Sequence, residues 1–218
     1  MKGKHEICGM QILLIAATTE EIKPFTAAHP VIDVLITGVG VPSVLYHLQK
    51  RMQQIDYDLI IQAGIAGAFR PDMELGQTVL VKQDCFADLG IEEKENYTPI
   101  FETAFADKNE PPFVNGWLVN KTHYLNKTAL SLVKAITVNK VSDSALQKEQ
   151  FIKQFNPDLE TMEGAGLHYI CLQENVPFIQ IRSVSNYIGE RDKTKWKIKE
   201  AIENLNKELL ILINRLTN

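Results

Sequence analysis

The chain has 218 residues, of which 45% are hydrophobic and 23% charged, as is typical of a soluble globular protein with one sizeable core. Its net charge of −4 argues against a nucleic-acid partner, because binding to phosphates needs a basic face. No apolar stretch approaches the roughly 20 residues of a membrane span, so we expect a cytoplasmic protein. Cys8, Cys85 and Cys171 lie far apart and predict reduced thiols, neither a disulfide framework nor a metal pair.

Short apolar runs alternate with helical periodicity along the whole chain. Six runs fit strands, at Ile12–Ala16, Val31–Ile36, Leu59–Ala63, Gly76–Val81, Ile136–Val141 and Phe178–Val184. Four stretches have helical spacing, at Val41–Gln54, Asp143–Phe155 (after Ser142 as its cap), Glu163–Asn175 and Thr194–Leu216. The alternation predicts one α/β domain over residues 1–218, built as a three-layer α/β/α sandwich with a central mixed, twisted β-sheet.

Acidic residues follow the first predicted strand directly, in the segment Thr18–Glu21. In open α/β sheets, ligands bind at the edge where the strands end. A carboxylate at that edge, from Glu20 or Glu21, can activate a water molecule. Acidic residues in the first turn of a helix are also favoured by the helix dipole alone, so the spacing leaves both interpretations open.

Glycines follow the next two predicted strands, at positions 38 and 40 and again at 64 and 67. Glycine lets backbone N–H groups approach a ligand closely, and it also permits tight turns, so either reason explains them. The pattern is not a full G-x-G-x-x-G and has no P-loop lysine. It therefore disfavours a dinucleotide or a nucleoside triphosphate as ligand.

Two further polar side chains lie near predicted strand ends. The carboxylate of Glu163, in Thr161–Gly164, can accept from two vicinal hydroxyls at once, which suits a ribose diol, although helix capping is a rival explanation. Asn186 offers a donor and an acceptor on one planar group, although an asparagine at the start of a loop is common. His168 accompanies no nucleophile motif and no metal-ligand spacing, so we expect no hydrolytic triad, no metal and no cofactor.

Taken in order, these segments resemble the purine nucleoside phosphorylase/uridine phosphorylase-like superfamily. The likeness is greatest to nucleosidases that act on methylthioadenosine and S-adenosylhomocysteine and, above all, to the futalosine hydrolases of menaquinone biosynthesis. It is carried by Ile12–Ile22, Ile61–Gly67 and Thr161–Ala165, and the ordered set is more specific than any one of them. The resemblance implies cleavage of the N-glycosidic bond of a nucleoside.

The resemblance also implies residue roles. Glu21, and not Glu20, falls on the general base that activates the attacking water, and Asn186 falls on the residue that stabilises the departing base. Glu163 would bind the 2′- and 3′-hydroxyls. The other implied contacts are the ribose face at Met162 and backbone near the water and sugar at Ala66 and Gly67.

The expected nucleophile follows from two features that phosphorylases have and this chain lacks. Phosphorylases of this superfamily have an arginine that opens the glycine segment, where this chain has Gln62 or Ala63, and they have an early Gly-Asp-Pro stretch that is missing here. A phosphate dianion without a cationic partner would be poorly held, so water is the expected nucleophile. A phosphate-dependent purine nucleoside phosphorylase remains an alternative.

The chain differs from the adenine-specific nucleosidases at Asn186, where those enzymes have an aspartate. An asparagine can donate its NH₂ to O6 of a 6-oxopurine and accept from N7–H of departing hypoxanthine. Mismatched buried polar groups cost on the order of 1–3 kcal/mol each. We therefore expect a hypoxanthine nucleoside, for which futalosine is the candidate, and keep the methylthioadenosine/S-adenosylhomocysteine nucleosidases as the alternative.

Futalosine carries a carboxyphenyl ketone on its 5′ side, which some part of the protein has to hold. Arg191 is the candidate for the carboxylate, although a surface ion pair also explains it, and Phe86 or Phe101 is the candidate for stacking. Relatives are commonly homo-oligomers, so the resemblance implies a dimer or larger assembly. The segment Asn96–Trp117 is a candidate for that contact.

Overall fold

The structure is a computed structural model that describes residues 9–28 and 32–217. Cys8 and Val31 therefore lie outside the described residues. None of the described helices is both long and apolar enough to cross a membrane.

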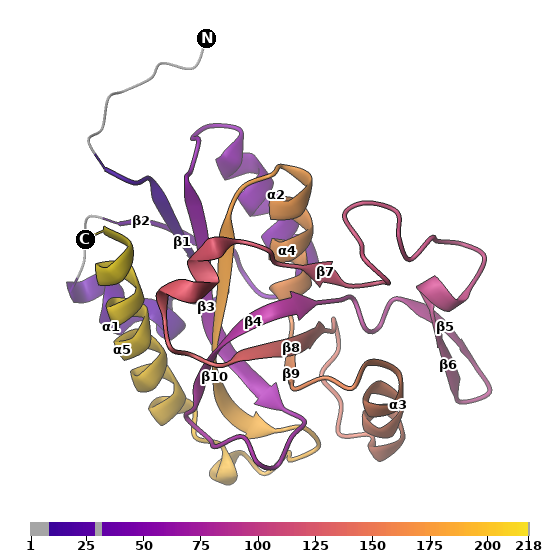
Figure 1. Ribbon diagram of the computed structural model, residues 1–218. Coiled ribbons are helices and arrows are strands. Elements are labelled where there is room, and N and C mark those ends of the chain that lie inside the picture. Colours follow the sequence, from indigo (N-terminus) through magenta and orange to yellow (C-terminus); the bar gives the residue numbers. More distant parts are fainter. Residues whose placement is uncertain (1–8, 29–31, 218) are drawn as a thin grey trace.

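A mixed sheet of eight strands forms the centre of the described chain. Its strands are β1 (Ile12–Ala16), β2 (Asp33–Ile36), β3 (Leu59–Ala68), β4 (Thr78–Asp84), β7 (Leu118–Val119), β8 (Leu132–Thr137), β9 (Leu159–Thr161) and β10 (Phe178–Tyr187). Five pairings are parallel and three are antiparallel, so the expected mixed sheet is confirmed. A separate hairpin of β5 (Gly90–Glu93) and β6 (Asn96–Pro99) projects from it (Figure 1).

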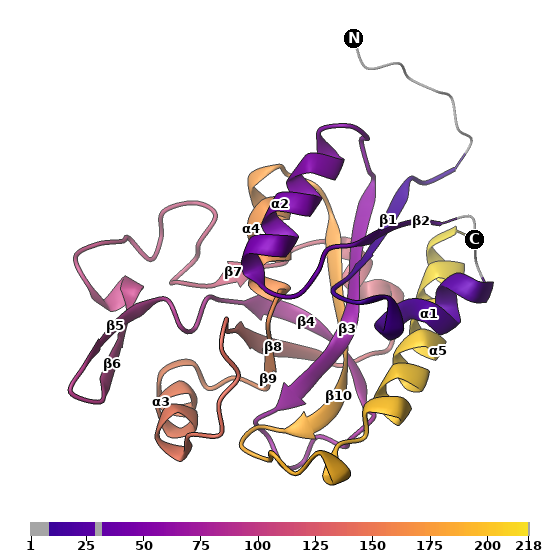
Figure 2. The same ribbon diagram turned by 180° about the vertical axis from the view of Figure 1, so that it is seen from behind.

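Helices cover both faces of the sheet. They are α1 (Thr19–Ala28), α2 (Val41–Met52), α3 (Ala145–Phe155), α4 (Gly164–Gln173) and α5 (Ile198–Thr217), with short 3₁₀ turns at Ile100–Glu102, His123–Lys127 and Lys193–Lys195. Figures 1 and 2 show α1 and α5 on one side of β1 and β3, and α2 and α4 on the other. The three-layer arrangement is the one that the apolar runs predict.

Two clusters of core residues, one on each face of the sheet, explain why β1 is apolar at every position. Ile12, Leu14 and Ala16 pack with α1 and α5, whereas Leu13 and Ile15 pack with α2 and α4. Successive side chains of a strand point to opposite faces, so a strand between two helical layers buries all of them. Continuous apolar runs in the sequence therefore indicate the central strands of the sheet.

Five of the strands close on themselves, a feature that the sequence does not predict. β3 pairs with β10, β10 with β4, β4 with β8, β8 with β9, and β9 returns to β3. A third core cluster draws residues from all five strands, including Ala66, Val79, Val133, Leu159 and Val184. Because β3 reaches Ala68, it can pair with β1 along its first half and with β9 at its end.

Several element boundaries differ from the sequence-based expectation. β3 runs through Gly64 and Gly67, where the sequence allowed a turn, and β8 begins at Leu132, four residues before the expected start. Val141, expected in that strand, lies in the loop that follows it. Ser144, and not Ser142, caps α3 through its hydroxyl. The short strands β5, β6, β7 and β9 were not predicted, because runs of two to four residues carry little periodic signal.

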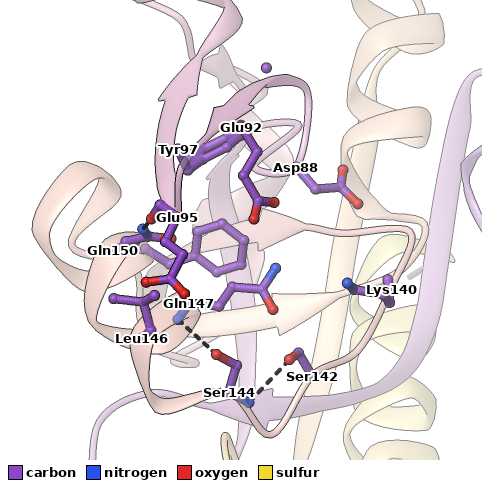
Figure 3. A pocket seen from close by; sticks show the side chains of 12 residues that line it. Asp88, Glu92, Glu95, Tyr97, Lys140, Ser142, Ser144, Leu146, Gln147 and Gln150 are labelled. Carbon is purple, nitrogen blue, oxygen red and sulfur yellow. Dashed lines mark hydrogen bonds between the residues drawn. The ribbon is translucent and has the colours of Figure 1, made fainter.

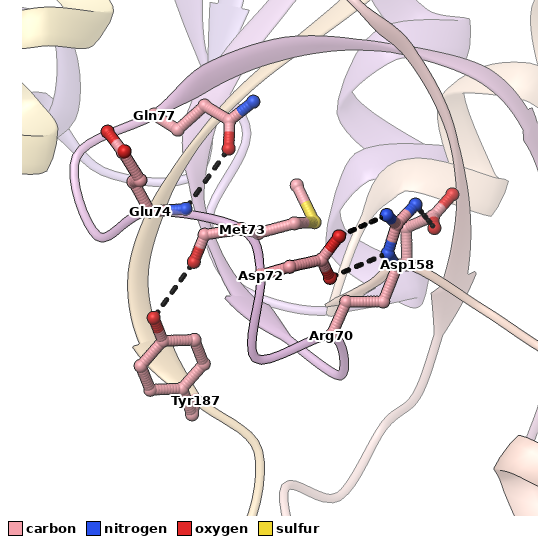
Figure 4. A network of polar contacts seen from close by, with 7 residues as sticks. All are labelled: Arg70, Asp72, Met73, Glu74, Gln77, Asp158 and Tyr187. Carbon is pink, nitrogen blue, oxygen red and sulfur yellow. Dashed lines mark hydrogen bonds and ion pairs between the residues drawn. The ribbon is translucent and has the colours of Figure 1, made fainter.

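The loop between β3 and β4 is fastened to two other parts of the ring (Figure 4). The guanidinium of Arg70 bonds Asp158, just before β9, at 3.1 Å. The hydroxyl of Tyr187, at the end of β10, donates to the Met73 carbonyl at 2.9 Å. These contacts hold the ends of β3, β9 and β10 together.

A buried amide joins α5 to the first turns of α1. Asn206 is 6% exposed; its Oδ1 accepts from Phe25 N at 2.9 Å, and its Nδ2 donates to the Glu21 carbonyl at 2.8 Å. The backbone at Glu21 is thus held by a helix from the far end of the chain.

We expect Asn206→Leu to lower the free energy of unfolding by about 1–3 kcal/mol, because buried backbone groups lose this partner. Urea denaturation measures it. Lys207→Leu, at the exposed neighbouring position, is the control and should change stability by less than about 0.5 kcal/mol. Equal effects of the two changes would contradict the role given to Asn206.

Candidate active site

A cavity of about 360 Å³ opens where β1, β3, β9 and β10 bring their polar ends together. Six residues expected from the sequence line it: Glu21, Ala66, Gly67, Met162, Glu163 and Asn186. Four glutamates contribute to its wall, and no lysine or arginine is among the described residues that line it. The cavity is thus an acidic pocket with apolar surfaces from Val141, Trp196 and Ile198.

Glu21 is fixed by hydrogen bonds to both carboxylate oxygens. Oε2 accepts from the backbone N–H and hydroxyl of Thr18, at 3.1 and 3.2 Å, and Oε1 accepts from Ile65 N at 3.1 Å. The bond to Thr18 N is half of a capping box, so the helix-start interpretation is correct for this residue. Glu21 is 8% exposed and still lines the cavity, whereas Glu20 is exposed at its rim.

Gly64 lets two charged side chains approach the β3 backbone. A Cβ at this position would lie 2.0 Å from Arg182 Nη1 and 2.8 Å from Glu21 Oε1. The glycine is therefore required for close approach within a strand, and a tight turn does not explain it. Gly38 and Gly40, by contrast, have positive φ angles, which a residue with a side chain rarely adopts, in the bend before α2.

Arg182 is the functional neighbour that the sequence analysis did not select. Its side chain is 1% exposed, and its Nη2 donates to Gln62 Oε1 at 2.7 Å. It lies behind Gly64 and does not line the cavity, so it supplies positive charge without offering a surface to a ligand. A cation inside an apolar strand run is rare, and that is the signal that could have identified it.

Glu163 precedes α4 but does not cap it with its side chain. Its Oε1 instead accepts from the backbone N–H of Gly40 at 2.8 Å, in the glycine segment between β2 and α2. Burial, with a smaller contribution from Glu21, raises the pKa of Glu163, while Arg182 and the Gly40 N–H lower it. The carboxylate is therefore held in place at the cavity wall and is not used by its own helix.

A β-bulge in β10 directs two adjacent side chains into the cavity. Val184 pairs with Ala66 and Asn186 with Gly67, so Ser185 is the extra residue. Neighbours on a regular strand point to opposite faces, and a bulge changes that direction. Ser185 and Asn186 both line the cavity, and the Ser185 hydroxyl donates to Asn186 Oδ1 at 2.8 Å.

Glu160 is a second wall residue that the sequence analysis left without a role. It pairs with Gly67 from the β9 side, opposite Asn186 on β10, and it is 7% exposed. Burial raises its pKa to about 7, and the nearby charge of Asp88 adds to this, while Arg191 lowers it.

Two residues expected at the site lie away from its wall. Phe86 packs edge-on against Tyr169, with ring centroids 6.2 Å apart, and does not line the cavity. Arg191 is exposed and acts on Glu160 through its charge. Their roles toward a substrate stay predictions.

A neighbouring cavity of about 380 Å³ is similar in size but differs in chemistry (Figure 3). It lies between the β5–β6 hairpin and the start of α3, with Asp88, Glu92 and Lys140 on its wall. None of the site residues expected from the sequence lines it. In the described part of the chain, no three His, Cys, Asp or Glu side chains are grouped so as to hold a metal ion.

Comparisons with known proteins identify the family of the chain. The family profile of the phosphorylase superfamily matches residues 15–217. The futalosine hydrolase of Streptomyces coelicolor is 30% identical over 79% of this chain and 74% of its own length. Among solved structures, the futalosine hydrolase of Helicobacter pylori has a TM-score of 0.81 at 16% identity, covering 95% of this chain and 99% of its own.

A 5′-methylthioadenosine/S-adenosylhomocysteine nucleosidase of Helicobacter pylori has a TM-score of 0.82 at 16% identity, covering 96% of this chain and 100% of its own. The chain belongs to the phosphorylase superfamily. Within that superfamily it is a nucleosidase, an enzyme that hydrolyses the N-glycosidic bond of a nucleoside.

The charge on Glu160 makes stability depend on pH. Its pKa in the folded protein is about 7, above the usual 4.5, so ionisation destabilises the fold as pH rises through that range. Glu160→Gln should therefore raise the free energy of unfolding by about 1–3 kcal/mol at roughly pH 8. The difference should vanish below about pH 4.5, where the side chain is neutral in both states. Urea denaturation across this range checks the prediction, and a constant difference would contradict it.

Proposed function

We propose that the enzyme hydrolyses futalosine to hypoxanthine and dehypoxanthine futalosine, with Glu21 as the base. The acidic character of the cavity is the observation that favours water over phosphate as the nucleophile. Four glutamates line it, and no lysine or arginine does among its described residues. Such a wall repels a phosphate dianion and favours the positive charge that a ribosyl group gains as its N-glycosidic bond breaks.

The reaction begins with lengthening of the C1′–N9 bond, whose electron pair leaves with the base. The water oxygen then bonds to C1′ and passes a proton to the Glu21 carboxylate, while the departing base takes up a proton from solvent at N7. Two backbone N–H groups and the Thr18 hydroxyl hold that carboxylate in one orientation. Glu163 accepts from the ribose hydroxyls, with Met162 against the sugar.

Asn186 recognises the base through its side-chain amide. Its Oδ1 already accepts from the Ser185 hydroxyl and has a second lone pair for N7–H of departing hypoxanthine. Its Nδ2 has only a 3.2 Å contact with the Tyr187 carbonyl and is available to donate to O6. Adenine offers an amino group at that position, which the Nδ2 donor would face unfavourably.

The substrate can be tested by incubating the enzyme with futalosine, inosine and methylthioadenosine, with and without phosphate. We expect hypoxanthine and a free sugar product from futalosine, at a rate that phosphate does not change. A sugar phosphate product would indicate a phosphorylase. Faster release of adenine from methylthioadenosine would indicate the alternative nucleosidase.

In the same assay, Asn186→Asp should lower kcat/KM for futalosine and reduce the preference over methylthioadenosine by about tenfold, which corresponds to one mismatched polar contact. Unchanged selectivity would contradict the role of Asn186.

Glu21→Gln should lower kcat by about 10²- to 10⁴-fold, because an amide cannot take the proton from water. The affinity for free hypoxanthine should stay near that of wild type, measured by isothermal titration calorimetry. Glu20→Gln is the matched control, since Glu20 is adjacent but exposed, and it should retain most turnover. Similar losses in both variants would contradict Glu21 as the base.

A further inference from the structure

The turn that carries Met162 and Glu163 is held from behind by two buried hydroxyls. Gly164 N donates to Thr161 Oγ1 at 3.3 Å, and Ala165 N donates to Thr137 Oγ1 at 2.8 Å. The two hydroxyl oxygens are 3.0 Å apart. The first N–H groups of α4, which lack partners within the helix, are thus satisfied by threonines from β8 and β9.

A buried carboxylate anchors this pair. Asp84 is 0% exposed, and its Oδ1 accepts from Thr137 Oγ1 at 2.9 Å and from Cys85 N at 2.8 Å. Its other oxygen lies against the turn itself, because a Cβ at Gly164 would be 2.2 Å from Asp84 Oδ2. Neither Asp84 nor Thr137 lines the cavity.

The same carboxylate is connected to the charge behind Glu21. With its amide oriented to satisfy its neighbours, Gln180 donates to Asp84 Oδ2 at 3.2 Å and accepts from Arg182 Nε at 3.3 Å. The Gln180 amide also donates to His168 Nε2 at 2.8 Å, and His168 Nδ1 contacts the Leu118 carbonyl at 2.9 Å. One continuous buried network therefore joins the backbone N–H groups of Gly164 and Ala165, which follow Glu163, to the guanidinium beside Glu21.

We propose that Asp84 and Thr137 are positioning residues of the nucleosidase site, which hold the first turn of α4 so that Glu163 meets the ribose. Neither residue touches the substrate. Even a fully hydrogen-bonded buried charge can often be replaced by apolar side chains without loss of stability, so stability alone does not account for an aspartate at this place. The inference rests on the proposed role of Glu163 toward the sugar.

The test compares ligands that contain ribose with the free base. Thr137→Val keeps the shape of the side chain and removes the hydroxyl. We expect KM for the nucleoside to rise roughly 10- to 100-fold, since small misplacements of a binding group have effects of this size. The dissociation constant of hypoxanthine should change less than about twofold, because the base lies against β10. Thr137→Ser, which keeps the hydroxyl, should restore KM.

Thr78→Val is the matched control. Thr78 is also a buried sheet threonine, but its hydroxyl donates to Ser183 and not to the turn. It should lose stability without a rise in KM. If Thr137→Val and Thr78→Val change KM equally, or if Thr137→Val weakens nucleoside and base alike, the positioning role is overturned.

Asp84→Asn provides a second variant should Thr137→Val not fold. Its amide nitrogen would face the Gln180 donor, so the same selective rise in KM is expected, and a wild-type KM would overturn the inference. The wild-type enzyme separates the two proposals. If it releases no base from any nucleoside, the proposed function fails, whereas normal wild-type turnover with a silent Thr137→Val variant defeats only the positioning role.

Discussion

The buried guanidinium of Arg182 is the charge on which the arrangement of the site depends. Glu21 and Glu163 are both almost fully buried, and the charge of Glu21 adds to the rise in the pKa of Glu163 that burial causes. Burial raises the pKa of both Glu163 and Asp84, and the charge of Arg182 opposes that rise. Because Gly64 has no side chain, this cation approaches the β3 backbone closely without entering the cavity. The positive charge of Arg182 therefore favours the ionised form of the carboxyl groups near it.

The closed ring of strands determines which side chains meet at the cavity. β3 is long enough to pair with β10 on one side and with β1 and then β9 on the other, so residues from three strands meet at Gly67. Glu160 and Asn186 flank this glycine, and the bulge at Ser185 directs the amide into the cavity. A nucleoside at this place would have its base beside β10 and its sugar beside the start of α4. The acidic wall suits cleavage by water, and Asn186 suits a 6-oxopurine.

Much of the fold followed from local patterns, whereas the set of site residues followed from the resemblance to a known family. Apolar runs indicated the central strands because helices bury both faces of β1 and β3. Glu21, Met162, Glu163 and Asn186 all lie near strand ends or helix starts, where ligands bind in such sheets, and they do line one cavity. Short strands and the ring were missed, since pairing between distant segments leaves no periodic signal. Arg182 was missed because Gln62, which accepts from its guanidinium, and Glu163, whose pKa it lowers, lie on other segments of the chain.

By itself, the sequence determined the layers and the central strands, because these depend on periodicity over a few neighbours, and its resemblance to a known family selected segments that line the cavity. Only the tertiary structure decided which carboxylate is buried at the cavity wall and which faces solvent. Glu20 and Glu21 are adjacent in sequence, yet Glu21 alone is buried against Thr18 and Ile65. The tertiary structure also decided that Gly64 serves close approach and that Asp84 lies beneath the α4 turn. These outcomes depend on contacts between strands far apart in the chain, and such contacts exist only once the sheet has closed.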